Sequence, residues 1–302
     1  MRDEVRALVR GIREDRRHGA AELAERALLA LRLVAESSPA AGAEALLAEL
    51  KEAGRALAGA RPTMVAIAAA VRRFLQAVAV RAGEVPPAEL RRLAVACAEE
   101  TTRRLHTAAG KIAVHAGGLL PPGAVVMAHS YSSTVLAALR YLHGRGKVGR
   151  VVVTRAGAGC TGLALAGELA GAGVLVRLID DTAVALFLPG VVAVFLGADA
   201  VYPDGVVNGV GSLQVAVLAA RQGVPVYVLA DTFKLAPRPA GEMALEEGDP
   251  VEVAGGVPLP AGVVVSNPRF DVTPPGLITA LVTEEGALPV EAALERLTPS
   301  GG

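Results

Sequence analysis

The first 116 residues alternate hydrophobic and polar positions with the period of an α-helix. Leu23, Leu28, Leu31 and Val34 fall on one side of a helical wheel, as an amphipathic helix packed on a core requires. Few runs in this part of the chain suit a β-strand. The pattern predicts helices at residues 2–17, 20–37, 40–54, 63–82 and 87–116.

The pattern changes at residues 117–123, Gly-Gly-Leu-Leu-Pro-Pro-Gly, which end the last of these helices. Short apolar runs then alternate with helical stretches, as in strands buried on both faces of a parallel sheet. Strands are predicted at residues 124–128, 151–154, 174–179, 191–196 and 224–230, with helices at 133–144, 162–171 and 211–222. The sequence predicts an α/β protein: a helical N-terminal domain, residues 1–120, followed by a Rossmann-like parallel-sheet domain, residues 121–302.

Composition narrows the classes of partner. The 302 residues carry 30 basic and 30 acidic side chains and no Trp, so neither a basic surface nor stacking platforms favour nucleic acid. The most apolar run, residues 183–198, is interrupted by Pro189-Gly190 and is too short to span a bilayer. Two cysteines, Cys97 and Cys160, cannot form a disulfide framework. We therefore expect a cytoplasmic protein without nucleic-acid or membrane partners.

Asp199 follows an apolar strand in the sequence Gly197-Ala198-Asp199, and Asn208 comes nine residues later, before a predicted helix. Ligands of open α/β sheets bind at the carboxyl ends of the strands. A carboxylate and an amide at this edge can hold and protonate a polyol. From the residues alone, an Asp that caps local backbone amides remains the other interpretation.

The run His129-Ser130-Tyr131-Ser132-Ser133 joins a predicted strand to a predicted helix. Serines at this position cap the helix, and they can also bind an anion through their hydroxyls and the free backbone N–H groups. The residues alone leave both interpretations open.

A glycine-rich loop, Gly157-Ala158-Gly159-Cys160-Thr161-Gly162, follows the second predicted strand, and Asp180-Asp181 follow the third. In form it matches a dinucleotide fingerprint, in which glycines let the backbone approach a pyrophosphate and an acid binds ribose hydroxyls. In such sites the loop follows the first strand, so its position here argues against a dinucleotide. A dinucleotide-binding oxidoreductase is kept as a second alternative.

The most specific signal is the order of motifs across residues 194–284. A strand ends in Gly-Ala-Asp, and Val-Asn-x-x-Gly, a helix, a strand, Asp-Thr-Phe-Lys and Asn-Pro-x-Phe-Asp-Val-Thr-Pro-Pro follow. This order resembles the alpha, beta and delta regulatory subunits of eukaryotic initiation factor 2B. Their family shares its fold with methylthioribose-1-phosphate isomerase and ribose-1,5-bisphosphate isomerase. The resemblance covers essentially the whole chain.

The resemblance implies roles for single residues. Asp199 matches the acid/base of the isomerases, and Ser130 stands where they carry a cysteine that exchanges protons with a substrate carbon. Residues at substrate-binding positions are Gly19, Ala20, Arg61, Asn208 and Lys234.

Four further positions depart from the family pattern. Gly209 replaces a lysine that follows the asparagine, and the loop at residues 157–162 lacks the usual Arg-Pro pair and glutamine. No cofactor or metal is implied.

These departures predict a protein related to initiation factor 2B that binds a sugar phosphate or a nucleotide and is weakly or not catalytic. Ser130 is the main reason to expect little catalysis, because a serine hydroxyl does not lose its proton near neutral pH as a thiol can. The alternative is an active aldose-1-phosphate to ketose isomerase. Members of the family pair through the α/β domain, so we expect a homodimer or a higher homo-oligomer.

Overall fold

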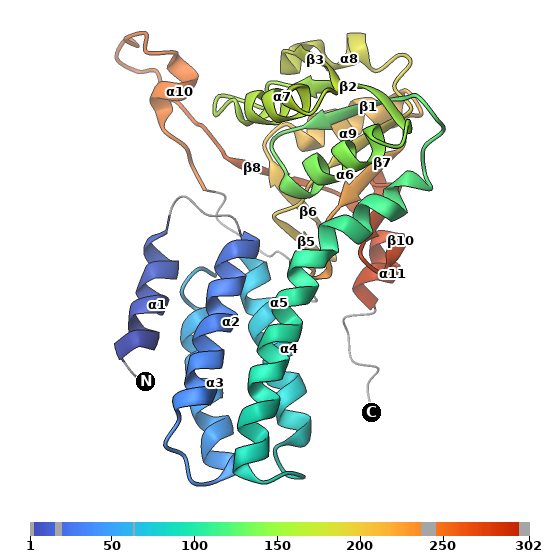
Figure 1. The fold of residues 1–302 in the computed structure, drawn as a ribbon. Helices are drawn as coiled ribbons and strands as arrows, with labels where there is room; N and C mark the ends of the chain where they lie inside the picture. The colour runs from blue at the N-terminus through green and yellow to red at the C-terminus, as the bar shows by residue number, and fades with distance from the viewer. Residues whose placement is uncertain (1–2, 16–19, 63, 237–245, 296–302) are drawn as a thin grey trace. The chain divides into compact units, whose positions relative to one another are not determined.

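The computed structural model describes residues 3–15, 20–62, 64–236 and 246–295. The chain forms two compact units (Figure 1). The first holds the helical part as far as Ala108 together with Phe233–Leu235, and the second holds Ala109–Thr232 and the chain from Ala236 onward. The division between the units falls after Ala108, inside the helix at Pro87–Gly117, which is earlier than the boundary expected at residue 120. The expected domain boundary stays a prediction.

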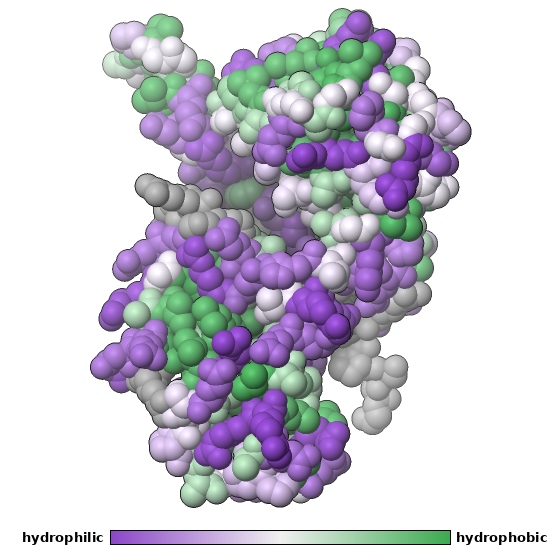
Figure 2. All heavy atoms as spheres, in the orientation of Figure 1, coloured by the Kyte–Doolittle hydropathy of each residue, from purple (hydrophilic) through white to green (hydrophobic). Residues whose placement is uncertain are grey.

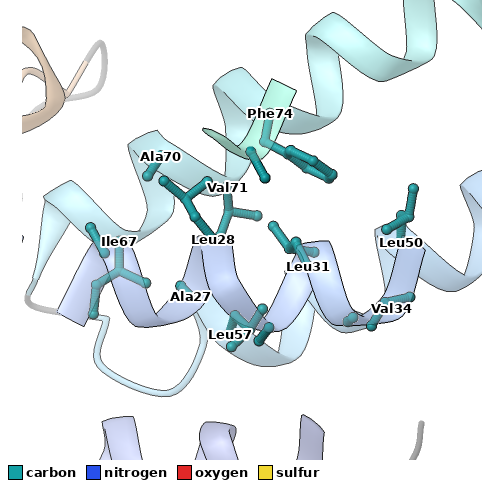
Figure 3. Close-up of a cluster of buried hydrophobic side chains, with 14 of the residues drawn as sticks. Ala27, Leu28, Leu31, Val34, Leu50, Leu57, Ile67, Ala70, Val71 and Phe74 are labelled. Atoms are coloured by element: carbon teal, nitrogen blue, oxygen red, sulfur yellow. The ribbon is translucent and has the colours of Figure 1, made fainter. Parts of the chain in front are cut away.

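The helical unit is built on α1 (Asp3–Glu14), α2 (Ala20–Ser37), α3 (Ala43–Ala58), α4 (Val65–Arg81) and the first part of α5 (Pro87–Gly117). Helices α2, α3 and α4 contact one another. Their apolar faces form one core, in which Leu28, Leu31, Leu57 and Phe74 are fully buried (Figure 3). The periodicity that predicted the helices therefore corresponds to burial, and their observed bounds lie close to the predicted ones.

One predicted helix end is wrong. Helix α3 continues past Gly54 to Ala58, whereas the sequence predicted an end at Gly54. A Cβ at Gly54 would lie 2.9 Å from side-chain atoms of both Val71 and Leu75 on α4. The glycine therefore marks a close helix–helix approach and does not end the helix.

The second unit contains a seven-stranded sheet of order β10-β9-β7-β4-β1-β2-β3. All neighbouring strands are parallel except β10 and β9. The strands are β1 (Ala124–His129), β2 (Val148–Thr154), β3 (Leu175–Ile179), β4 (Ala193–Leu196), β7 (Val226–Leu229), β9 (Ala280–Thr283) and β10 (Gly286–Leu288). The predicted fold class, a helical part followed by a mostly parallel sheet, is confirmed.

Helices pack on both faces of this sheet. α6 (Ser133–His143) and α7 (Thr161–Gly171) contact each other and β2, whereas α9 (Ser212–Arg221) contacts α8 (Val184–Phe187), β4 and β7. Right-handed crossovers that proceed outward from β1 in opposite directions place these two pairs on opposite faces. The strand order reverses between β1 and β4, which is the topological switch point of a doubly wound sheet.

A second, three-stranded antiparallel sheet follows β4, with the order β5-β6-β8. Its strands are β5 (Ala200–Tyr202), β6 (Gly205–Gly209) and β8 (Phe270–Thr273). The sequence predicted no strand between residues 196 and 211, and this is corrected by the hairpin of β5 and β6. Helix α11 (Val290–Glu295) follows the sheets.

Residues 246–269, which precede β8, project as an excursion that carries the short helix α10 (Pro250–Ala254) (Figure 1). Its apolar side chains include Val251, Val257 and Val264, which are exposed. Figure 2 shows apolar residues at the surface of this excursion. Across the described ranges, no helix combines the length and the apolar character needed to cross a membrane.

Candidate functional site

The carboxyl ends of β1 and β4 lie next to each other at the switch point, because these strands pair in parallel with His129 opposite Leu196. Ser130 follows β1, and Gly197-Ala198-Asp199 follow β4. Crevices at switch points are where open α/β sheets bind ligands. The topology therefore brings the two predicted catalytic residues to one edge of the sheet.

A cavity of about 320 Å³ opens at this edge, a volume within the ~300–1,000 Å³ of small-molecule sites. Among the described residues, those that line it belong to the second unit. They come from the loops after β1, β2 and β4, from β6, from the excursion before β8 and from the first residue of β8. Ser130, Asp199 and Asn208 all line it. Arg269 lines it as well, although the sequence gave no sign of a role for this residue.

Ser130 and Asn208 contact each other inside the cavity wall. The Asn208 amide nitrogen donates to Ser130 Oγ at 3.4 Å and to Ser212 Oγ at 2.8 Å, and Ser212 Oγ donates to the carbonyl of Gly209 at 2.7 Å. Asn208 is only 4% exposed. Because Ser130 Oγ accepts from the amide, its own proton is available to a ligand oxygen.

Small residues allow this close packing. A Cβ on Gly209 would lie 3.0 Å from Ser130 Cβ, and a Cβ on Gly197 would lie 2.6 Å from Ser132 Oγ. Ser132 caps α6, since its Oγ accepts from Val135 N at 3.3 Å. The serines of this run therefore have different roles, since Ser132 caps α6 and Ser130 lines the cavity.

Asp199 is exposed and follows β4 after Gly197 and Ala198. Its backbone N–H donates to the carbonyl of Val207 at 2.8 Å, which attaches the strand end to the β5–β6 hairpin. This contact holds the backbone of Asp199 against β6, and both Asp199 and Asn208, the next residue of β6, line the cavity. An acid on the open side of the cavity can exchange protons with a ligand and with water.

His129 does not line the cavity, but it contacts residues next to the cavity wall. Its Nε2 lies 2.8 Å from the carbonyl of Val210, and its Nδ1 lies 2.6 Å from Thr154 Oγ1. Burial lowers the pKa of His129 below its ordinary value of 6.5, against smaller opposing effects that include Asp181. A neutral imidazole that donates from Nε2–H to Val210 and accepts from Thr154 satisfies both contacts.

The glycine-rich loop has the backbone geometry of its motif. Gly157 has φ +64°, and a Cβ on Gly162 would lie 1.8 Å from the carbonyl oxygen of Thr154. The Asp181 carboxylate accepts from the N–H of Ala156 at 2.9 Å and of Gly157 at 2.8 Å. Because Asp181 holds the loop itself, the loop lacks the ribose-binding acid of a dinucleotide site. The oxidoreductase alternative is therefore not favoured.

Three non-glycine residues have positive φ in the described part of the chain: Ser130, Ala156 and Cys160. All three lie in loops after β1 and β2, next to the cavity, and such strained backbone tends to gather at functional sites. Cys160 does not line the cavity, and its Sγ accepts from Arg155 Nε at 3.2 Å.

The remaining predicted substrate-binding residues fall elsewhere. Gly19 lies outside the described residues, and Ala20 begins α2. Arg61 and Lys234 belong to the helical unit, where the Arg61 guanidinium donates to the carbonyl of Asp15 at 2.5 Å. Their roles stay predictions. In the described ranges no group of three His, Cys, Asp or Glu side chains could hold a metal ion.

Fold and site together define an α/β protein with a polar cavity at the switch point of its sheet. Residues 16–290 match the Initiation factor 2 subunit family. The chain belongs to this family, which confirms the resemblance seen in its motifs.

Two relatives among the sugar-phosphate isomerases match most of the chain. A ribose 1,5-bisphosphate isomerase of Haloferax volcanii is 37% identical, covering 91% of this chain and 85% of the relative. A methylthioribose-1-phosphate isomerase of Chloroflexus aurantiacus is 34% identical, covering 97% and 90%. The crystal structure of the Pyrococcus horikoshii translation initiation factor eIF-2B superimposes with a TM-score of 0.74 at 27% identity, covering 96% of this chain and 98% of that one.

Proposed function

We propose that this chain is a sugar-phosphate isomerase that converts an aldose 1-phosphate into the corresponding ketose phosphate. The observation that carries the proposal is the convergence of Asp199, Ser130 and Asn208 in one cavity at the switch point. Relatives named as isomerases of ribose 1,5-bisphosphate and of methylthioribose 1-phosphate match nearly the whole chain. Their substrates define the substrate class proposed here.

The reaction needs two proton transfers. Asp199 protonates the ring oxygen as the bond from that oxygen to C1 breaks, and it later takes up the proton that the C2 hydroxyl loses. A proton then moves from C2 to C1 while the C2 hydroxyl becomes the ketone carbonyl. The resemblance assigns the transfer between these carbons to the position of Ser130, whose hydroxyl accepts from the Asn208 amide at 3.4 Å. The resemblance also implies substrate contacts by Gly19, Ala20, Arg61 and Lys234, and these stay predictions.

Turnover of ribose 1,5-bisphosphate and of methylthioribose 1-phosphate tests the proposal, with the ketose product measured. Asp199→Asn is expected to abolish turnover, because a carboxamide acts as neither an acid nor a base near neutral pH. Asp204→Asn, in the turn between β5 and β6 and outside the cavity lining, is the matched control and is expected to keep it. Equal turnover by both variants would refute the role of Asp199.

A second candidate is a binding protein that holds a sugar phosphate or a nucleotide without turning it over. Ser130 favours it, since the resemblance implies a cysteine there and a serine hydroxyl does not ionise near neutral pH. Ligand binding with no product, and no gain on Ser130→Cys, would favour this candidate. Product formation that increases on Ser130→Cys would favour the isomerase.

A further inference from the structure

Arg269 lies in a slot between two loops of the second unit. A Cβ on Gly159, in the loop after β2, would lie 2.8 Å from Arg269 Nη1, and a Cβ on Gly248, in the excursion, would lie 2.5 Å from Arg269 Nε. Any other residue at either position would displace the guanidinium. The backbone of Arg269 is fixed as well, because its N–H donates to the carbonyl of Glu246 at 2.8 Å and its carbonyl accepts from Val210 N at 3.0 Å.

One carboxylate orients the guanidinium. Glu252 on α10 accepts from Nη2 at 2.9 Å and lies 2.8 Å from Nη1, and Asn267 donates to the same carboxylate at 2.9 Å. The hydrogen bonds from Arg269 and then Asn267 lower the pKa of Glu252, so it stays ionised at neutral pH. This two-point contact occupies two of the five N–H donors of an arginine. The contacts of the described residues leave the other donors for a ligand.

The charges of the side chains around the cavity single out Arg269 as the group that can attract a phosphate. Asp199 and Glu246 place carboxylates in the lining, and both repel a phosphate. Arg269 is the cation among the described residues that line the cavity, and its side chain is 35% exposed. A planar guanidinium held in one orientation by a carboxylate is well suited to bind a phosphate through paired hydrogen bonds.

We propose that Arg269 binds a phosphate group of the ligand, while Asp199, Ser130 and Asn208 contact its sugar. The inference rests on the proposed function for the identity of the ligand. It adds a specificity-determining residue that discriminates a phosphorylated sugar from a neutral one. Glu252 is then a positioning residue that acts through Arg269.

Calorimetric titration of the full chain with ribose 1,5-bisphosphate, ribose 1-phosphate and ribose 5-phosphate tests the assignment. Arg269→Gln is expected to weaken binding of ribose 1,5-bisphosphate about ten- to a hundredfold, the effect of a lost charged hydrogen bond. Arg269→Lys is expected to lose less, because it keeps the charge without the fork. Of the two monophosphates, the one whose phosphate contacts Arg269 is expected to lose affinity in parallel, while the other is unchanged.

Two matched variants control the experiment. Arg150→Gln removes a positive charge from the exposed start of β2 and is expected to bind like the natural chain. Glu252→Gln removes the partner of Arg269 but keeps the cation, and it is expected to retain most of the phosphate affinity. A purely structural Arg269–Glu252 pair would instead give the same loss in Arg269→Gln and Glu252→Gln, and that result would overturn the inference.

Turnover separates this inference from the proposed function. If the natural chain isomerises ribose 1,5-bisphosphate and Arg269→Gln leaves KM and affinity unchanged, the inference fails and the function stands. If no product forms but Arg269→Gln selectively loses phosphorylated ligands, the inference stands and the function fails. Failure of the natural chain to bind any of the three phosphates would overturn the inference.

Discussion

Replacing Gly162 by alanine tests how closely α7 packs on β2. The new Cβ would lie 1.8 Å from the Thr154 carbonyl oxygen, 3.0 Å from its carbon and 3.1 Å from the carbonyl carbon of Arg155. All three are backbone atoms, so the contact is relieved only if the start of the helix moves away from the strand. Overpacking typically costs about 1–3 kcal/mol, and a clash this short lies at or above the top of that range.

The same helix supplies an internal control. Gly167 is exposed on α7, with no atom within 4 Å of an added Cβ. Alanine there gains about 0.5–1 kcal/mol over glycine in a helix interior. Even after crediting Gly162→Ala with this gain, we expect it to destabilise the second unit by about 2 kcal/mol or more. The two substitutions, five residues apart, therefore have opposite signs.

Urea unfolding followed by tyrosine fluorescence measures the difference. The chain has four tyrosines and no Trp. All four tyrosines belong to the second unit, at residues 131, 141, 202 and 227. The signal thus reports this unit alone, which matters because chains with two compact units often unfold in more than one step. Equal stabilities for the two variants, or a Gly162→Ala chain as stable as the natural one, would refute the packing argument.

Three further predictions follow from other parts of the molecule. Because His129 has a lowered pKa in the fold, its contribution to the free energy of unfolding is present above about pH 6.5 and is lost as the pH falls toward the folded pKa. The loss is up to ~1.4 kcal/mol per pH unit. The free energy of unfolding measured against pH should show this slope, and His129→Gln should flatten it. Arg61→Ala should weaken a phosphorylated ligand by about 1.5–3 kcal/mol, and unchanged affinity in a titration would place the phosphate elsewhere. Sedimentation at micromolar concentration should show a homodimer, and a monomer with no concentration dependence would contradict this.

The elements that the sequence predicted well are those specified by local periodicity. The helical bounds of α2, at residues 20–37, agree with the prediction, because burial repeats along the helix as the apolar residues do. The strands β1, β2 and β4 were recognisable as continuous apolar runs because both faces of the sheet are covered. Gly54 was misinterpreted because a glycine at a helix–helix contact has the same sequence signal as one at a helix end.

The small sheet could not be predicted in this way. β6 pairs with β8, so that Asn208 lies opposite Asp271, and no local pattern announces a partner 63 residues away. The site shows the same limit. Ser130 and Asp199 were found because motif order and strand ends place them, whereas Arg269 stands in an irregular Pro-containing stretch. The position of the Arg269 side chain at the cavity depends on Gly159 and Gly248, two glycines distant in sequence that leave room for it.

The membership of Phe233 in the helical unit has a consequence for the order in which the chain folds during synthesis. Phe233 is fully buried in the core of that unit, with the Arg73 guanidinium 4.3 Å from its ring centroid. The ribosome makes α1 to α4 more than 150 residues before it makes Phe233. N-terminal domains usually fold as soon as they emerge, but this helical core lacks the ring of Phe233 until most of the sheet has been synthesised. The core of the helical unit can therefore be completed only after residue 233 has emerged from the ribosome.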